Sequence, residues 1–527
     1  MIRIDERPED TSRTLMHMLK HAVERNASGE ALVLLGGVRL SFSDLLTSVL
    51  EFSEELQARG SSGDRVAVAL PNSADAVIAI LGAIAARSQV VLLNPSYTIR
   101  ELEPILLDAD PLVIVCTSRL VENSDLVSRM TRSTPVVVCS PYESLVRRGA
   151  KMLPSQLLLP EPDDLAILQY TGGTTGRSKG VNLTHRTTAL NIVQREAMLP
   201  TRFMRERFLC MTPLFHSYAT ATSFFPAIYS AGALVVMPRY DAEQALDAIE
   251  AERITLFCGA PTIYNGLVAH PRFAHKKYST LIGAYSGAAP LSMATLSAWE
   301  QTTHVPIAEG YGLTEATAIL CFNPLFGMRK AGSVGLPLPG TQIEIVDAED
   351  ENRVLGPGEA GELRARAPQI MTGYRGRPDE TNAIIRDGWL YTGDIGEVDS
   401  DGYVFIRDRK KDMAIVGGYN VFPREVDEVL AAHPAVVDAV SVGVPDSYRG
   451  EVIEACVTLR SGIACDEEEL RNHCLANLAR YKVPAQIYIV SEVCKTPAGK
   501  IDRRCTREWL TAQPRDSDRP KAADRKA

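Results

Sequence analysis

A segment rich in glycine and threonine, YTGGTTGRSKG at Tyr170–Gly180, combines residue types that bind phosphate. Glycine lets backbone N–H groups approach an anion, threonine hydroxyls add donors, and Arg177 and Lys179 supply positive charge. The Walker P-loop is excluded because it requires a glycine immediately before its lysine, where this chain has Ser178. We therefore predict a different phosphate-binding loop, in which the nucleotide contacts come from Thr171, Gly172, Gly173, Thr174, Thr175, Gly176 and Lys179.

A second segment, GYGLTE at Gly310–Glu315, has residue types that suit a nucleotide and a metal ion. Its glycines, Gly310 and Gly312, permit a close approach, and Tyr311 offers a flat ring to an adenine. Thr314 carries a hydroxyl for a phosphate, and the carboxylate of Glu315 is a hard oxygen ligand for Mg²⁺. The segment predicts a site for ATP and Mg²⁺, and the alternative for Glu315 is a solvated surface carboxylate.

The elements that must position these segments alternate between strand and helix. From about 60 to 290, apolar strand-like runs such as DRVAVAL alternate with helical patterns, one of which starts at Asp241. This alternation predicts an α/β fold with mainly parallel sheets covered by helices. From about 340 to 408, short β-like pieces between glycines and prolines predict a smaller β-rich subdomain. A compact α+β pattern follows the charged run RDRKKD at Arg407–Asp412.

This change of pattern predicts a domain boundary at Arg409–Lys411. We expect a large N-terminal domain of βαβ layered sheets over residues 1–409 and a small α+β C-terminal domain over 410–512. The remaining residues, 513–527, are rich in charge and have almost nothing to bury, so we expect a disordered tail.

Composition excludes several classes of protein. The 527 residues carry a net charge of -9, which offers no basic field to nucleic acid. The longest uninterrupted apolar run, Ala76–Ala86, has 11 residues, whereas about 20 are needed to cross a bilayer, so no transmembrane segment is expected. The N-terminal residues lack the basic and apolar regions of a signal peptide, and we expect a cytoplasmic protein.

Cysteine and histidine spacing gives little support for a metal centre. The ten cysteines include no C-x-x-C pair, and we expect reduced thiols. His17 and His21 have the i, i+4 spacing of a helical metal site, but Met18 stands where H-E-x-x-H requires its Glu. We interpret this pair as the polar face of an N-terminal helix.

The phosphate loop and GYGLTE are followed, in order, by three further segments: YTGD at Tyr391–Asp394, RDRKKDMAIVGGYNVFPREVDEVL at Arg407–Leu430 and KTPAGKIDR at Lys495–Arg503. Together the five segments resemble the adenylate-forming superfamily of acyl-CoA synthetases, luciferases and nonribosomal peptide adenylation domains. The similarity extends over about residues 15 to 510. It implies that the N-terminal domain binds AMP and that the small C-terminal domain is mobile, with one closed orientation for adenylation and another for thioester formation.

The resemblance assigns a catalytic role to Lys500, whose ammonium would contact both anions as a carboxylate joins the α-phosphate of ATP. It assigns Asp394 to the ribose hydroxyls, Arg409 to the same nucleotide and Lys411 to the hinge. His216, in PLFHSYA, would border the acyl pocket, and a structural histidine is the alternative.

Two further sets of residues take their roles from the same resemblance. One set would line the adenine face, and the other would lie beside the pantetheine arm of CoA. They are Gly287, Ala288 and Ala289 for the adenine, and Gly417, Gly418 and Tyr419 for the pantetheine.

These implied roles predict an AMP-forming carboxylate–CoA ligase, an acid–thiol ligase that uses ATP and CoA as co-substrates and Mg²⁺ as cofactor. Among such ligases, the chain most resembles those that act on medium- or long-chain fatty acids. An aromatic acid is the alternative substrate. An amino acid is disfavoured because PLFHSYATATSFF carries no acidic residue to meet an ammonium group. Three further functions are compatible with the segments: an acyl-AMP ligase that loads a carrier protein, a luciferase-like oxygenase and a non-catalytic nucleotide sensor. A monomer and a homodimer are both compatible with the sequence.

Overall fold

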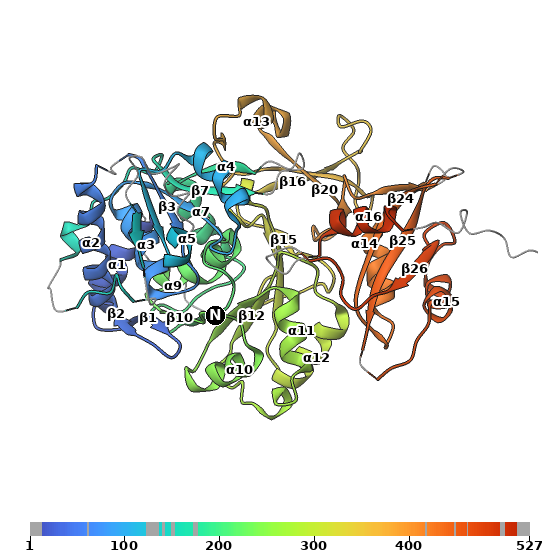
Figure 1. Cartoon of the computed structure of the whole chain (residues 1–527), viewed down its shortest axis with the longest axis horizontal. Helices are drawn as coiled ribbons and strands as arrows, with labels where there is room; N and C mark the ends of the chain where they lie inside the picture. Colours follow the sequence, from blue (N-terminus) through green and yellow to red (C-terminus); the bar gives the residue numbers. More distant parts are fainter. Residues whose placement is uncertain are drawn as a thin grey trace, which may run out of the picture. The chain divides into compact units, whose positions relative to one another are not determined.

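The computed structural model describes residues 13–60, 63–122, 136–139, 143–148, 153–171, 178–416, 419–446, 449–460, 462–495 and 501–513. The chain forms two compact units (Figure 1). Each unit has its own apolar core. The first unit comprises Met1–Glu344, Arg364–Thr392 and Asp399–Val404. The second unit comprises Ile345–Leu363, Gly393–Val398 and Phe405–Ala527.

A seven-stranded sheet of the first unit has the order β18-β8-β7-β4-β3-β5-β6. The pairs from β7 through β4, β3 and β5 to β6 are parallel, whereas β8 is antiparallel to both β7 and β18. The bounds are β3 (Arg65–Ala69), β4 (Gln89–Leu92), β5 (Val113–Cys116), β6 (Val136–Val138), β7 (Leu165–Thr171), β8 (Lys179–Thr184) and β18 (Gly373–Tyr374).

Helix α3 (Ala74–Ala85) packs against β3 and β4 and is buried on all sides. It begins at Ser73, whose hydroxyl accepts a hydrogen bond from the Ala76 N–H at 3.1 Å. Because α3 is apolar all round, it belongs in the interior, where α2 (Phe42–Ala58) covers it. The other helices of this part are α1 (Leu15–Asn26), α4 (Ile99–Ala109), α5 (Ser118–Glu122) and α7 (His185–Arg195).

A nine-stranded sheet of the same unit has the order β15-β14-β13-β12-β11-β9-β10-β1-β2. Its central strands are parallel, and β14, β15 and β2 are antiparallel to their neighbours. The bounds are β1 (Glu30–Leu34), β2 (Arg39–Ser41), β9 (Arg207–Cys210), β10 (Ala233–Val236), β11 (Leu256–Gly259), β12 (Gly283–Ser286), β13 (Ile307–Tyr311), β14 (Cys321–Phe322) and β15 (Leu336–Pro337). The helices are α8 (Ser217–Ala219), α9 (Phe225–Tyr229), α10 (Ala242–Ala251), α11 (Pro261–Ala269) and α12 (Met293–Thr303).

A five-stranded sheet with the order β16-β17-β20-β19, in which β21 also pairs with β20, forms the β-rich part of the chain. Its bounds are β16 (Gln342–Val346), β17 (Gly361–Arg366), β19 (Ile385–Arg386), β20 (Trp389–Val398) and β21 (Val404–Arg409), and α13 (Pro378–Ile384) precedes β19. The second unit adds the sheet β23-β22-β25-β24, with β26 beside β25. Those strands are β22 (Ala414–Val416), β23 (Tyr419–Val421), β24 (Val436–Asp446), β25 (Gly450–Leu459) and β26 (Gln486–Ile489), with helices α14 (Pro423–Ala431), α15 (Glu467–Asn477) and α16 (Arg503–Thr511).

The structure confirms the predicted α/β class with its β-rich sheet and its smaller α+β part. The helix expected at Asp241 is α10, where the carboxylate of Asp241 caps the Gln244 N–H at 2.9 Å. The domain boundary at Arg409–Lys411 stays a prediction, and the tail predicted at 513–527 lies outside the described residues except for Gln513. Among the residues that the structure describes, none of the helices has the length and apolar character needed to cross a bilayer.

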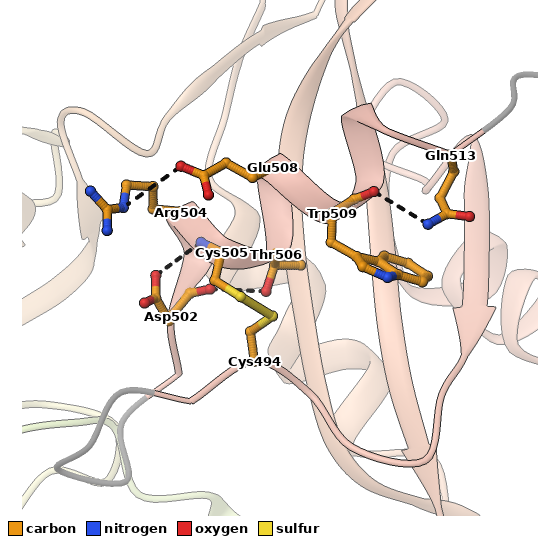
Figure 2. The surroundings of a disulfide bond; sticks show 8 residues. All are labelled: Cys494, Asp502, Arg504, Cys505, Thr506, Glu508, Trp509 and Gln513. Atoms are coloured by element: carbon orange, nitrogen blue, oxygen red, sulfur yellow. Dashed lines mark hydrogen bonds and ion pairs between the residues drawn. A yellow bond between two sulfur atoms is a disulfide. The ribbon is translucent and has the colours of Figure 1, made fainter.

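The expectation of reduced thiols is wrong for two of the ten cysteines. Cys494 and Cys505 form a disulfide (Figure 2), although 11 positions separate them in the sequence. Their Cα atoms are 6.0 Å apart because the chain folds back on itself between β26 and α16. The other eight cysteines are free, as expected.

Candidate active site

The predicted phosphate loop joins two antiparallel strands. β7 ends at Thr171, β8 begins at Lys179, and these two residues are partners in the strand register. Both side chains are half-buried. The rest of the predicted loop lies outside the described residues, so its nucleotide contacts stay predictions: Gly172, Gly173, Thr174, Thr175 and Gly176.

Lys179 is held by an acidic side chain and an aromatic ring. Its Nζ lies 2.5 Å from Oε2 of Glu380 and 5.1 Å from the centroid of the Tyr374 ring. Hydrogen bonds from Lys179 and then Arg377 lower the pKa of Glu380 below its ordinary value. The side chain of Lys179 is only 15% exposed, so solvent screens its charge weakly, and an anion that bound the ammonium would compete with Glu380.

Glu315 lies in a 3-10 turn that directly follows β13. Its Oε1 accepts a hydrogen bond from the hydroxyl of Tyr374 at 2.7 Å, and its carbonyl accepts one from the Met371 N–H at 2.8 Å. Burial, with the added charge of Glu315, raises the pKa of Tyr374 well above its ordinary value, so the phenol keeps its proton and donates it. Tyr374 thus contacts Lys179 with its ring and Glu315 with its hydroxyl. The fold brings together residues of the two predicted nucleotide segments.

The GYGLTE segment runs through a crowded and strained stretch of backbone. A Cβ at Gly312 would stand 1.7 Å from the carbonyl oxygen of Ala318, and a Cβ at Gly310 would stand 2.4 Å from the Phe322 ring. Directly after the segment, Thr317 and Ala318 have positive φ angles of 60° and 119°. Such backbone persists only where the surrounding structure over-determines it, as at binding sites. Both glycines are therefore required by the close approach of their neighbours.

The residues predicted to line an adenine follow β12, next to β13. Gly287 is buried, whereas Ala288 and Ala289 are exposed, and Ala288 has a φ of 68°. A Cβ at Gly287 would stand 2.8 Å from the ring of Tyr218. Because β12 and β13 are parallel neighbours, their carboxyl ends place this turn beside the start of GYGLTE. This is the edge of the sheet at which α/β proteins bind nucleotides.

His216 is the N-cap of the short helix α8, and its Nδ1 accepts the Tyr218 N–H at 3.2 Å. The hydroxyl of Tyr218 reaches two strands, donating to the carbonyl of Tyr285 at 3.1 Å and to that of Gly259 at 3.4 Å. A buried π-helical turn, Thr220–Phe224, follows α8, and π-helical turns are frequent at functional sites.

A small internal cavity of about 10 Å³ lies against this turn, which is room for one water molecule. Apolar atoms make up most of its lining surface, although six of the eleven lining residues carry an amide or hydroxyl group. It is formed by Ile167, Gln169, Leu183, Thr188, Asn191, Ile192, Ser217, Thr220, Ala221, Phe225 and Thr317.

The second unit contains a nucleotide-site candidate of its own. Asp394, in β20, is 3% exposed, and its Oδ1 lies 2.9 Å from Nε of Arg409 at the end of β21. The next residue, Lys410, donates through its backbone N–H to Gly393 at 2.9 Å, and its Nζ lies 2.6 Å from Glu362. Asp394 and Arg409, which were assigned to the same nucleotide, therefore contact each other, and the side chain of Arg409 is 56% exposed. Their roles toward the ribose and the nucleotide stay predictions.

Four other predicted residues have little or no described structure. Tyr419 is exposed, and its ring stacks on Tyr481 with centroids 4.7 Å apart. Gly417, Gly418 and Lys500 lie outside the described residues, so the roles assigned to them stay predictions.

Two family descriptions match this chain. The AMP-binding enzyme family matches residues 19–375, and the AMP-binding enzyme C-terminal domain matches residues 425–500. The chain belongs to the AMP-binding enzyme family. A long-chain-fatty-acid–CoA ligase of Bacillus subtilis (strain 168) is 37% identical, and the match covers 94% of each chain. A feruloyl-CoA synthase of an Amycolatopsis species is 34% identical, over 88% of this chain and 93% of that protein.

Among solved structures, ATP-bound MatB from Rhodopseudomonas palustris superposes on this AMP-binding enzyme with a TM-score of 0.88. It is 28% identical, over 95% of this chain and 99% of that chain. The AMP-binding enzyme described here is thus an adenylate-forming acid–thiol ligase of the acyl-CoA synthetase class.

Sequence reasoning missed three residues of this AMP-binding enzyme: Tyr218, Tyr374 and Glu380. The segment MTGYRGRPDE at 371–380 has a glycine before its tyrosine and acidic residues where a helix starts, which is a weak signal of a structured turn. No spacing rule connects it with Lys179. The connection comes from the pairing of β18 with β8, in which Tyr374 is the partner of Val181.

Among the described residues, one group of possible metal ligands is closely spaced. It consists of His433, Cys465 and Glu469, whose ligand atoms lie within 4.8 Å of one another. However, Nδ1 of His433 accepts the Ala435 N–H at 3.3 Å, and Nε2 lies 3.6 Å from Oε1 of Glu469. The backbone contact already occupies one ring nitrogen, and the other faces the Glu469 carboxylate, so these contacts account for the group without a metal ion.

The N-terminal histidine pair also has other partners. Nδ1 of His17 lies 2.7 Å from the hydroxyl of Thr14, and the ring of His21 lies 5.5 Å from that of Phe203. Both histidines lie in α1, half-buried, and the interpretation of the pair as the polar face of this helix stays a prediction.

Proposed function

We propose that this AMP-binding enzyme converts a medium- or long-chain fatty acid to its CoA thioester in two steps. In the first, a carboxylate oxygen attacks the α-phosphorus of ATP, which forms acyl-AMP and releases pyrophosphate. In the second, the sulfur of CoA attacks the acyl carbon, and AMP leaves. The observation that carries the proposal is the arrangement of Lys179 and Glu315 on either side of Tyr374. The substrate class rests on the Bacillus subtilis ligase, whose name states that it acts on long-chain fatty acids.

The residues of the first unit would hold the triphosphate. Lys179 would exchange Glu380 for a phosphate oxygen, which the ammonium binds as a point charge. The hydroxyl of Thr314 would donate to the α-phosphate, and Tyr311 would lie against the adenine. Glu315 fits a Mg²⁺ site because it is a half-buried hard oxygen donor, and Tyr374 occupies only one of its two oxygens. Bound there, Mg²⁺ would offset the charge of the phosphates.

The residues of the second unit would complete the nucleotide contacts and the chemistry. Asp394 would accept hydrogen bonds from the ribose hydroxyls, and Arg409 would contact the same nucleotide. Lys500 would contact both the carboxylate and the α-phosphate, so that its charge acts where negative charge accumulates. Tyr419, with Gly417 and Gly418, would lie along the pantetheine arm during the second step.

The acyl chain would enter beside His216 and extend toward the cavity next to the π-helical turn. The mainly apolar lining of that cavity suits an alkyl chain, and its small volume requires the surrounding side chains to move when a long acid binds. Aromatic acids form the second candidate class, because a feruloyl-CoA synthase is 34% identical. The polar groups of Gln169 and Asn191 in the lining would meet the ring substituents of such acids.

Pyrophosphate release with MgATP tests the proposal, measured for octanoate, hexadecanoate, benzoate and ferulate, each with and without CoA. We expect release that turns over only with CoA and that is fastest for a fatty acid. Faster pyrophosphate release with ferulate than with a fatty acid would indicate that the substrate is an aromatic acid. Release that does not depend on CoA would point to a carrier-protein acceptor or to an oxygenase.

The Lys500→Ala variant tests the assigned catalytic residue. We expect adenylation to fall by about three orders of magnitude, as when one preorganised charge is removed, with thioester formation from supplied acyl-AMP retained. The Lys277→Ala variant is the matched control, because Lys277 is another lysine and is exposed. Equal losses in both half-reactions would contradict the role of Lys500.

A further inference from the structure

The small cavity beside the π-helical turn is lined by three segments that also carry predicted site residues. Gln169 lies two positions before the end of β7, where the predicted phosphate loop begins. Ser217 directly follows His216, and Thr317 lies two positions after Glu315. All these residues belong to the first unit. The cavity therefore lies next to the residues predicted to hold the acyl group and the nucleotide.

Two amide side chains of the lining are buried, and each has an oxygen that the protein does not use. Gln169 is 7% exposed, and its Nε2 donates to the carbonyl of Phe215 at 3.1 Å. Asn191 of α7 is 1% exposed, and its Nδ2 donates to the carbonyl of Ile319 at 2.8 Å. Because a carbonyl can only accept, these two bonds fix which arm of each amide is the nitrogen. Within the part of the chain that the structure describes, Oε1 of Gln169 and Oδ1 of Asn191 have no hydrogen-bond partner.

Most of the hydroxyl groups in the lining already donate to the backbone. The hydroxyls of Thr188, Thr220 and Thr317 each donate to a backbone carbonyl, at 2.9, 2.9 and 2.6 Å respectively. Ser217 carries the fourth hydroxyl of the lining, which can rotate to donate or to accept. The polar groups with fixed partners therefore leave hydrogen-bond acceptors, rather than donors, for a molecule in the cavity.

Buried acceptors of this kind favour an occupant that carries an O–H group, because an unpaired buried oxygen is destabilising. Water can satisfy the two oxygens before an acid binds, and an alkyl group that takes its place cannot. A hydroxyl group on the acid can donate to one of them, while the apolar part of the lining accommodates methylene groups. An ammonium group is a poorer match, because none of the lining residues that the structure describes is charged.

We infer that Gln169 and Asn191 select an acid that carries a hydroxyl group at the end remote from its carboxylate. The inference deepens the proposed function and rests on it, because it requires the acyl chain to reach the cavity. Two kinds of acid share this chemistry: an ω-hydroxy fatty acid and a phenolic acid such as ferulate. In both, the carboxylate alone reacts, and the hydroxyl keeps its proton while it donates to an amide oxygen.

The direction of the preference distinguishes this arrangement from an ordinary apolar pocket. A pocket without unpaired acceptors favours the unsubstituted acid, because burying a hydroxyl without a partner is unfavourable. Here the hydroxyl gains a hydrogen bond and pairs an acceptor that an alkyl chain leaves unpaired. We therefore expect kcat/KM to be roughly tenfold higher for the hydroxylated acid than for its parent.

The test compares matched pairs of acids on the full-length protein. The ω-hydroxy derivatives of octanoate, dodecanoate and hexadecanoate are each paired with the unsubstituted parent, and ferulate is paired with its phenolic O-methyl ether. Pyrophosphate release with MgATP and CoA gives kcat/KM for every acid, and the ratio within a pair measures selection for the hydroxyl. The pair with the highest ratio shows whether the preferred acid is aliphatic or phenolic.

Three variants connect this ratio with the lining. Gln169→Met and Asn191→Leu each replace an amide by an apolar side chain of similar length. Thr188→Val is the matched control, because it removes a lining hydroxyl that is already bound to the backbone. Since each ratio compares two acids on the same protein, a general loss of activity does not change it. Melting temperatures monitor the fold, and the comparison of acids on the unchanged protein needs no variant.

The expected result is a roughly tenfold preference for the hydroxylated acid in at least one pair. This preference should be lost in at least one of the amide variants and retained in Thr188→Val. An equal or faster reaction of the parent in every pair would overturn the inference, and the proposed function would stand if plain fatty acids still gave CoA-dependent release. A preference that survives in both amide variants, or that is lost equally in Thr188→Val, would also overturn it. Absence of pyrophosphate release with every acid would overturn the proposed function and the inference with it.

Discussion

Replacing Tyr374 with phenylalanine removes one hydroxyl group and leaves the ring beside Lys179. The lost group donates to Oε1 of Glu315 at 2.7 Å, inside a site where Tyr374 is 9% exposed. A hydrogen bond to a charged group contributes about 1.5–3 kcal/mol. If the hydroxyl positions Glu315 for Mg²⁺ only in the adenylation step, the loss of this free energy corresponds to a fall of about 10- to 150-fold in the adenylation rate.

The assay separates the two half-reactions of the Tyr374→Phe variant. Exchange of labelled pyrophosphate into ATP in the presence of hexadecanoate measures adenylation, and supplied hexadecanoyl-AMP with CoA measures thioester formation. We expect the first rate to fall and the second to stay unchanged, because Tyr374 acts as a positioning residue for Glu315. The Mg²⁺ concentration that gives half the maximal rate should rise, which a purely structural role would not produce.

The matched control is Tyr278→Phe, which removes a buried hydroxyl that donates to the carbonyl of Phe273 at 2.8 Å, in the same unit. Both variants lose one hydrogen bond, so their melting temperatures should fall by similar amounts. Adenylation should fall only in Tyr374→Phe. An unchanged exchange rate in Tyr374→Phe, or an equal loss in the control, would refute the argument that the hydroxyl positions Glu315.

Two further predictions concern pH and acyl chain length. Burial lowers the pKa of His185 from 6.5 to about 4, so the folded state favours the neutral ring, and stability present above pH 6.5 is lost as the pH falls through about 4. In His185→Gln we expect the change in the free energy of unfolding between pH 6.5 and pH 4 to be smaller by about 3 kcal/mol, measured by urea unfolding at several pH values. If the free energy of unfolding varied with pH as steeply as in the unchanged protein, the assignment to His185 would be contradicted. Thr220 lines the small cavity, so Thr220→Leu should lower kcat/KM for hexadecanoate about tenfold more than for octanoate, by the loss of space for a few methylene groups. Equal losses for both acids in pyrophosphate release would show that the cavity does not receive the end of the chain.

Local chemistry in the sequence was sufficient to predict particular elements, and the resemblance of five segments was sufficient to predict the family. The helix that starts at Asp241 follows from an acidic cap and a 3.6-residue repeat, which act within a few residues of one another. The glycines of GYGLTE were predicted to admit a nucleotide, which stays a prediction; in the structure Gly312 has no room for a Cβ because the backbone of Ala318 lies against it. The class of enzyme followed from the order of five short segments, which needs no knowledge of distances.

Contacts between distant segments were decided only by the tertiary structure. Tyr374 reaches Lys179 and Glu315 because β18 pairs with β8, and no periodicity in the sequence specifies which strand lies beside another. The same reason explains the error on Cys494 and Cys505. Their spacing resembles no known redox motif, and it is the return of the chain from β26 into α16 that brings their Cα atoms within 6.0 Å. Residue types and their spacing determined what chemistry the chain can perform, and strand pairing decided which side chains meet to perform it.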